Sequence, residues 1–174
     1  RQTRTHNVDW SRARHDNLMH KDGFKDAAVI GVVMRERIFV ESAPDNLDPD
    51  RLKKRLTVED CGAIVSFTGI TRGSDNGENV LYLEFDSWEE KLKETLYELS
   101  EEAINKFNVK SIAISHRTGL VKPTENIVSI HVASAHRKEA FEGCSWLIDE
   151  LKNQAPIWKK EVKPSGSSWK SGLG

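Results

Sequence analysis

Positively charged side chains and a histidine gather in the second half of the chain. His136 and Arg137 follow an apolar stretch, Lys152 lies one predicted helix later, and residues 156–161 spell Pro-Ile-Trp-Lys-Lys-Glu. The whole chain has a net charge of −1, so this local excess of cations is not a property of the overall composition. Imidazole, guanidinium and ammonium groups in one region predict a site for an anionic ligand.

His136 and Arg137 stand where a predicted strand turns into a predicted helix. The free N–H groups of a helix start, together with these two side chains, are suited to hold a phosphate. The alternative is purely structural: Arg137 covers the surface and His136 packs in the turn.

The three lysines have structural alternatives too. Lys152 falls in the last turn of its predicted helix, where exposed carbonyls favour a cation whatever its function. Lys159 and Lys160 are neighbours in a predicted strand, so they point to opposite faces and at most one of them enters a given pocket. A partly apolar setting beside Trp158 would lower the pKa of Lys159 toward acid–base or nucleophilic use. Alternatively, both are edge-strand lysines that discourage aggregation.

Arg72 lies in a predicted loop over residues 68–73 that contains two glycines. Such loops let a ligand approach the backbone closely, although this one matches neither a phosphate-loop nor a dinucleotide-binding pattern. The histidines show no zinc-site spacing with Cys61 or Cys144, and no paired carboxylates suggest a hydrolytic metal. We therefore predict no metal and no cofactor.

Strands and helices are mixed along the chain without regular alternation. Apolar runs and alternation predict strands over 27–33, 37–40, 62–67, 80–85, 111–116, 127–133 and 157–162. Helices are predicted over 49–56, behind the N-cap Asp48, and over two longer segments.

Ser87 and Glu90 predict a capping box for the first long helix. The apolar stripes of the long helices, predicted to be core, are Trp88, Leu92, Leu96, Leu99, Ala103 and Phe107, then Ala140, Phe141, Cys144, Leu147, Ile148 and Leu151. The pattern predicts an α+β fold.

Length and composition narrow the class of protein. A chain of 174 residues with 37% hydrophobic and 30% charged residues fits one globular domain, and no apolar stretch is long enough for a membrane span. Two cysteines in apolar segments favour a reducing compartment such as the cytoplasm over a disulfide framework. The near-neutral charge disfavours nucleic-acid binding.

Residues 1–35 are predicted to be an amino-terminal extension, and residues 36–174 the functional domain. The first 25 residues are polar and lack periodicity, and their Asp9, Asp16 and Asp22 argue against an organellar transit peptide. A remnant of a fused module is the alternative reading of this segment.

Five blocks of the sequence together resemble the large, catalytic subunit of molybdopterin synthase, in order from about Arg37 to Trp169. They are Gly62 to Arg72, His116-Arg117-Thr118-Gly119, Ser134-Ala135-His136-Arg137, Ile148 to Lys152, and Pro156 to Glu161. The resemblance implies a dimeric α/β-hammerhead domain with a mixed or antiparallel sheet and two main helices. It also implies a heterotetramer in which two ubiquitin-like sulfur-carrier subunits bind through a C-terminal Gly-Gly thiocarboxylate. The implied reaction passes sulfur to cyclic pyranopterin monophosphate and makes the dithiolene of molybdopterin, a step of molybdenum cofactor biosynthesis.

The resemblance also assigns roles to single residues. Lys152 and Lys159 match the catalytic lysines, Phe67 an aromatic residue at the channel for the carrier tail, and His136 with Arg137 the phosphate-binding pair contributed across the dimer interface. The implied substrate-binding positions are Ile70, Thr71, Arg72, His136, Arg137, Lys152, Lys159, Lys160 and Glu161. Two departures are Ile148, where some members have methionine, and Leu173, where some bacterial members have an arginine that reaches the neighbouring subunit. The role of that arginine is either unfilled here or passes to Lys170.

Two other functions compete with the enzyme. A non-catalytic adaptor would bind the tail of a ubiquitin-like protein without a working pterin site, but loss of residues such as Arg72 or Lys152 would then be expected. A generic phosphate binder would carry a phosphate-loop glycine pattern, which the chain lacks.

Overall fold

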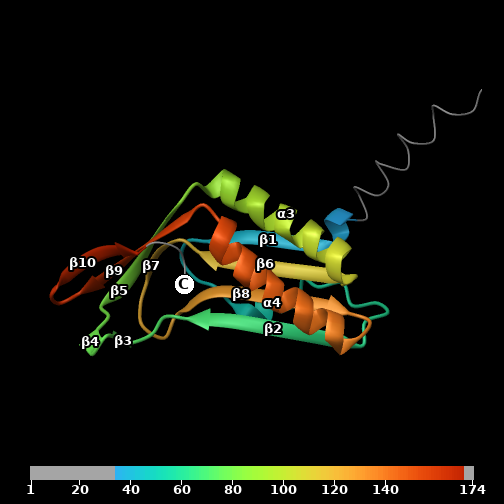
Figure 1. The fold of residues 1–174 in the computed structure, drawn as a ribbon, viewed down its shortest axis with the longest axis horizontal. Helices are drawn as coiled ribbons and strands as arrows, with labels where there is room; N and C mark the ends of the chain where they lie inside the picture. The colour runs from blue at the N-terminus through green and yellow to red at the C-terminus, as the bar shows by residue number, and fades with distance from the viewer. Residues whose placement is uncertain (1–33, 171–174) are drawn as a thin grey trace, which may run out of the picture. The chain divides into compact units, whose positions relative to one another are not determined.

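The computed structural model describes residues 34–170 (Figure 1). The predicted strand over 27–33 and nearly all of the predicted extension lie outside the described residues, so the boundaries of the extension stay a prediction. Within the described part, none of the helices combines the length and the apolar character needed to cross a membrane.

The first sheet has the strand order β1-β6-β8-β2. Its strands are β1 (Ile38–Ala43), β6 (Ser111–Arg117), β8 (Asn126–Ser134) and β2 (Ala63–Ile70). β1 runs parallel to β6, and the other neighbours are antiparallel. Helices α3 (Glu89–Phe107) and α4 (Arg137–Gln154) cover one face, while the short α2 (Pro49–Lys53) packs against β6 and β8. The predicted α+β class, with a mixed sheet and two main helices, is confirmed.

A second, antiparallel sheet has the order β10-β9-β5-β7. It consists of β10 (Gly166–Lys170), β9 (Ile157–Lys163), β5 (Tyr82–Ser87) and β7 (Gly119–Val121). A small hairpin, β3 (Ser74–Asp75) and β4 (Glu78–Asn79), precedes β5. Sequence patterns missed β7 and β10, because strands of three and five residues show too little alternation to be recognised.

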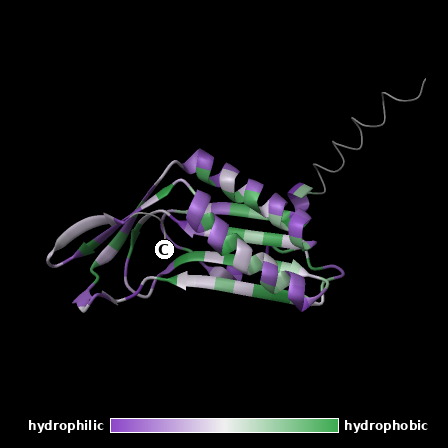
Figure 2. Cartoon of the chain, viewed as in Figure 1, coloured by the Kyte–Doolittle hydropathy of each residue, from purple (hydrophilic) through white to green (hydrophobic). Residues whose placement is uncertain are grey.

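The hydrophobic core lies between the first sheet and its two long helices. Leu92 and Leu96 of α3, Leu147 of α4, and Ile112 and Ile130 of the sheet are fully buried. Figure 2 shows the corresponding hydrophobic bands on the strands, with hydrophilic residues on the outer turns of α3. The predicted stripes are therefore confirmed except at their margins, because Trp88 and Phe141 are 63% and 62% exposed.

Two local predictions were wrong. The capping box fails because Asp86, one residue upstream, accepts the Ser87 backbone N–H at 2.9 Å, and α3 begins after Trp88, which makes no side-chain cap. The predicted loop over 68–73 begins late, because β2 continues its pairing with β8 as far as Ile70, with an irregularity between Gly69 and Ile70.

Candidate functional site

A cavity of about 300 Å³ lies where the ends of β2 and α4 meet the second sheet. Its wall is largely apolar and includes Phe67, Val80, Leu83, Phe85, Ile127, Val128, Ile148 and Leu151. Its ionisable residues are Arg72, Asp75, His116, Lys152, Lys159 and Glu161. An apolar enclosure with a few polar groups directed into it is typical of a small-molecule site.

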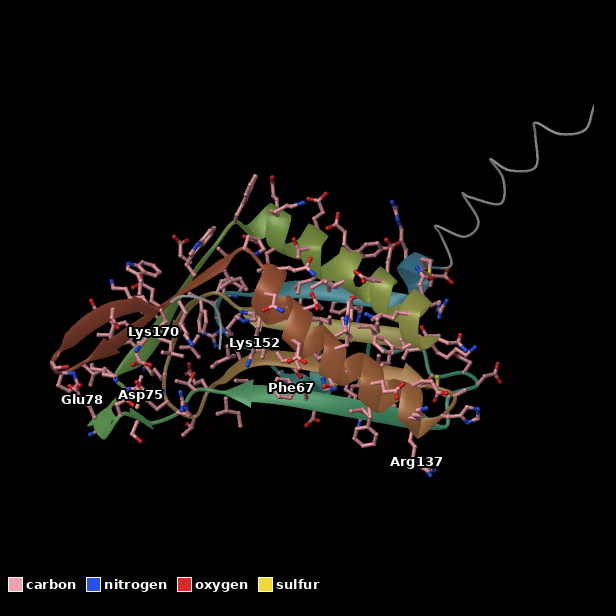
Figure 3. All side chains as sticks on the ribbon, viewed as in Figure 1. Phe67, Asp75, Glu78, Arg137, Lys152 and Lys170 are labelled. Atoms are coloured by element: carbon pink, nitrogen blue, oxygen red, sulfur yellow. The ribbon has the colours of Figure 1, made fainter. Side chains whose placement is uncertain are left out.

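Lys152 reaches this cavity from the last turn of α4. Ile148 and Leu151 line the cavity from the same helix, because residues three and four positions apart share one helix face. The Lys152 side chain is exposed, so its ammonium group is open to an incoming chain or ligand. Figure 3 shows Lys152 at the cavity end of α4.

Lys159 and Glu161 enter the cavity from one face of β9. They pair with Phe85 and Leu83 of β5, which line the cavity as well. Burial lowers the pKa of Lys159, nearby cations lower it further, and Glu161 partly opposes the shift. A lysine in this setting loses its proton more readily than an exposed one.

Lys160 lies on the opposite face of β9, as the alternation of a strand requires. Its ammonium group is 3.3 Å from the carboxylate of Glu84 and 5.8 Å from the centre of the Trp169 ring. The structure therefore places this predicted substrate-binding residue outside the lining of the cavity, because its neighbours 159 and 161 already occupy the inward positions.

Ile70 and Arg72 line the cavity, but Thr71 between them does not. Thr71 is buried, and its backbone is fixed by bonds with Glu125 and Thr124, at 3.0 and 2.9 Å. The Arg72 side chain is 79% exposed and lies 3.6 Å from Asp75. Thr71 thus anchors the segment that presents Arg72 at the rim.

His136 and Arg137 are not part of the cavity of their own chain. They stand at the start of α4, where His136 is the N-cap without a side-chain capping bond. Figure 3 shows Arg137 at the opposite end of the helix from Lys152. At 1.5 Å per residue, the two positions are about 22 Å apart along the axis.

Three further residues at or beside the cavity were not identified as site residues from sequence. His116 is buried in the cavity wall, donates from Nδ1 to the Arg117 carbonyl at 2.7 Å, and packs edge-on against Phe85. Burial lowers the pKa of His116 to about 4. The signal that could have identified it is its position two and four residues after Ile114 and Ile112, which puts all three on one face of the predicted strand. No local sequence pattern points to Asp75 and its partner Lys163, because their contact links segments that are far apart in the sequence.

The cations Arg72, Lys152 and Lys159 outnumber the carboxylates Asp75 and Glu161 around an apolar-walled cavity. Such a site suits a small organic molecule with an apolar part and an anionic group. The class is therefore that of a small α+β domain with a candidate site whose charges suit an anionic organic ligand.

Comparison with known proteins gives the family. The family model described as "MoaE protein" matches residues 42–154. The molybdopterin synthase catalytic subunit of Thermoplasma volcanium is 39% identical over 132 residues, which span 75% of this chain and 96% of that protein. The human protein of the same name is 36% identical over 126 residues, which span 72% and 67%.

Solved structures point to the same family. A molybdopterin synthase from Staphylococcus aureus superposes with a TM-score of 0.72 at 30% identity, covering 75% of this chain and 95% of that one. A complex of subunits 1 and 2 of the molybdopterin-converting factor from Helicobacter pylori gives 0.63 at 25% identity, covering 75% and 88%. The chain belongs to the MoaE family, whose curated members are molybdopterin synthase catalytic subunits. The family predicted from the sequence is confirmed.

Proposed function

We propose that this chain is the catalytic subunit of a molybdopterin synthase. It transfers sulfur from the C-terminal thiocarboxylate of a small ubiquitin-like subunit to cyclic pyranopterin monophosphate and forms the dithiolene of molybdopterin. The single observation that carries the proposal is that Lys152 of α4 and Lys159 of β9 line one cavity together with Arg72, which is distant from both in sequence.

The reaction makes demands that these residue types meet. A thiocarboxylate sulfur bonds to a substrate carbon as that carbon loses a bond to oxygen. Water then hydrolyses the resulting thioester, which leaves the sulfur on the substrate and releases the carrier as a carboxylate. Two such transfers are needed for one dithiolene, and the cyclic phosphate opens. Negative charge therefore becomes localised at several points, and fixed cations stabilise it most where water is excluded. The carrier supplies the nucleophile, so Cys61 and Cys144 have no part in the step.

The roles follow from position. The exposed Lys152 stands at the mouth, where it would meet the carrier tail and polarise its thiocarboxylate. The partly buried Lys159 would stabilise charge or transfer a proton deeper in the cavity. Phe67 would flank the tail, and Ile70, Arg72 and Glu161 would contact the pterin substrate, with Thr71 anchoring their segment. Lys160 would stabilise the second sheet.

The phosphate-binding pair, His136 and Arg137, would come from a second copy of the chain. β2 is an edge strand of its sheet within the described residues, and Ile64 on it and Phe141 on α4 are exposed. The first residue of β2, Ala63, pairs with Ser134, two residues before His136. Antiparallel contact of β2 with its copy about a two-fold axis would place the partner's α4 start beside the Ile70 end of this chain. The isolated chain therefore holds only part of each site.

This arrangement fits a dimer of hammerhead domains with one small subunit per cavity, a heterotetramer located in the cytoplasm. The Helicobacter pylori relative was solved as a complex of two different subunits, which supports a small partner for this chain.

The test is conversion of cyclic pyranopterin monophosphate to molybdopterin by this chain with a thiocarboxylated carrier. Wild type should make product, and Lys152→Ala should lose about a hundredfold, roughly 2.7 kcal/mol of transition-state stabilisation. Lys93→Ala is the matched control, because Lys93 pairs with Glu89 on the exposed side of α3, away from the cavity. If the carrier binds but wild type makes no product, the chain is an adaptor instead.

A further inference from the structure

The hairpin β3–β4 connects Arg72 to the second sheet. Its turn residues, Asn76 and Gly77, have φ values of 52° and 80°, which is typical of a tight two-residue hairpin turn. Two strands of two residues each bury almost nothing and would not hold their position alone. Contacts with the rest of the molecule must therefore fix this hairpin.

Those contacts come from β9 and from the turn after it. Lys163 Nζ donates to Asp75 Oδ2 at 2.8 Å and to the Asp75 carbonyl at 3.1 Å. On the other strand of the hairpin, the Glu78 carboxylate accepts the Ser165 backbone N–H at 2.8 Å and the Ser165 hydroxyl at 2.7 Å. Figure 3 shows Asp75 and Glu78 at this end of the molecule, near Lys170.

Lys163 is shared between two carboxylates. Its ammonium group also lies 3.0 Å from Glu161 Oε1, and the side chains of Lys163, Asp75 and Glu161 are only 14%, 16% and 9% exposed. Lys170 adds weaker contacts, at 3.9 Å to Asp75 and 3.7 Å to Glu161. Exposed ion pairs contribute little, but pairs this enclosed hold their geometry better and are costly to break.

Asp75 passes this constraint on to Arg72. Its Oδ2 faces Lys163 and its Oδ1 faces the Arg72 guanidinium at 3.6 Å. The Arg72 side chain is otherwise largely in solvent, so Asp75 restricts where the guanidinium stands at the cavity rim. A cation already in place avoids the entropic cost of ordering a long side chain when the ligand binds.

We propose that Lys163 and Asp75 are positioning residues that hold the β3–β4 hairpin against β9 and keep Arg72 over the cavity for the anionic group of the substrate. The proposal rests on the proposed function for the identity of that substrate. In this proposal Lys163 and Asp75 act through Arg72 and not on the reacting atoms.

A double-mutant cycle tests the coupling. The dissociation constant of cyclic pyranopterin monophosphate is measured by calorimetry for wild type, Lys163→Met, Arg72→Ala and the double variant. Each single change should weaken binding about tenfold, and the double variant should bind no more weakly than Arg72→Ala, because Lys163 acts through Arg72. Lys163→Arg should stay within about threefold of wild type. Wild-type affinity in Lys163→Met, or losses that multiply in the double variant, would overturn the proposal.

Amide hydrogen exchange of the ligand-free protein gives a second readout that needs no substrate. Exchange in the 73–80 peptide should be about tenfold faster in Lys163→Met and in Asp75→Asn, with the α3 peptides unchanged. Lys93→Met, which breaks an exposed pair on α3, is the control and should leave the 73–80 peptide unaffected. Unchanged exchange in both bridge variants refutes the positioning role. If exchange rises as expected but wild type binds no cyclic pyranopterin monophosphate, the proposed function is wrong, whereas the role of Lys163 and Asp75 in holding the hairpin is supported.

Discussion

Arg137 and Lys152 lie at the two ends of α4, about 22 Å apart along the helix axis, so one chain cannot bring them to one small ligand. Lys152 lines the cavity and Arg137 does not. A site that uses both must draw them from two copies of the chain.

This relationship predicts complementation between two inactive variants. Lys152→Ala and Arg137→Ala dimers should each be nearly inactive. After the subunits are mixed and exchanged, a mixed dimer contains one site with both residues intact and one site with neither. Random exchange makes half of the dimers mixed, so about a quarter of all sites, and about a quarter of wild-type activity, should return. Mixing each variant with itself is the control. No recovery, with subunit exchange verified by mass spectrometry, would mean that Arg137 does not act across an interface.

The lowered pKa of Lys159 predicts an alkaline limit to activity. Burial disfavours the charged form of Lys159, so it loses its proton below the ordinary lysine value of 10.5. Activity that needs this charge should therefore fall as the pH rises through the lowered pKa. Lys159→Arg keeps its charge and should extend activity to higher pH, whereas Lys159→Ala should lose about a hundredfold at pH values below the lowered pKa of Lys159. The measurement is the pH profile of kcat at saturating substrate. If the alkaline decrease occurs at the same pH in Lys159→Arg as in wild type, another group is responsible for it.

Sequence patterns predicted the parts of the fold that depend on local periodicity. The long stripe from Leu92 to Ala103 and the alternation from Ile127 to Ala133 each repeat often enough to identify a helix and a strand, and both are confirmed. The capping box at Ser87 was wrong because Asp86, one residue earlier, bonds the same N–H group. Competition of this kind depends on backbone geometry that a four-residue pattern does not contain.

The candidate site was predictable to a different extent. Alternation correctly separated Lys159 from Lys160, but it could not say which of them faces the cavity. The resemblance identified Arg72 and Lys152, yet gave no reason for Asp75 and Lys163, whose contact joins β3 to β9 across 88 residues of sequence. Long-range pairs of this kind arise only from the packing of the second sheet.

The absence of a side chain at Gly62 brings β2 close to the segment that carries His136. A Cβ at this position would lie 2.6 Å from the Ala135 carbonyl oxygen, and the Gly62 N–H already donates to Ser134 at 3.0 Å. Because both contacts involve backbone, neither partner moves away easily. Gly62→Ala should lower the free energy of unfolding by about 1–3 kcal/mol in urea titrations. Gly73→Ala is the control, since nothing lies within 4 Å of its added Cβ, and it should stay within about 0.5 kcal/mol of wild type. Equal losses in both variants would contradict the steric argument.

His116 makes stability depend on pH. Its pKa falls from 6.5 to about 4 on folding, because burial excludes the charged ring. Below pH 6.5, His116 therefore binds a proton in the unfolded chain but not in the folded chain. Its contribution to stability is complete above pH 6.5 and is lost progressively as the pH falls toward 4. Between pH 7 and pH 5 the loss attributable to His116 should be roughly 2 kcal/mol. His116→Gln keeps a donor for the Arg117 carbonyl but does not titrate. In urea titrations, its free energy of unfolding should therefore fall between pH 7 and pH 5 by roughly 2 kcal/mol less than that of wild type. The loss that remains should include His131, whose pKa burial also lowers. An unchanged pH dependence in His116→Gln would show that another group is responsible.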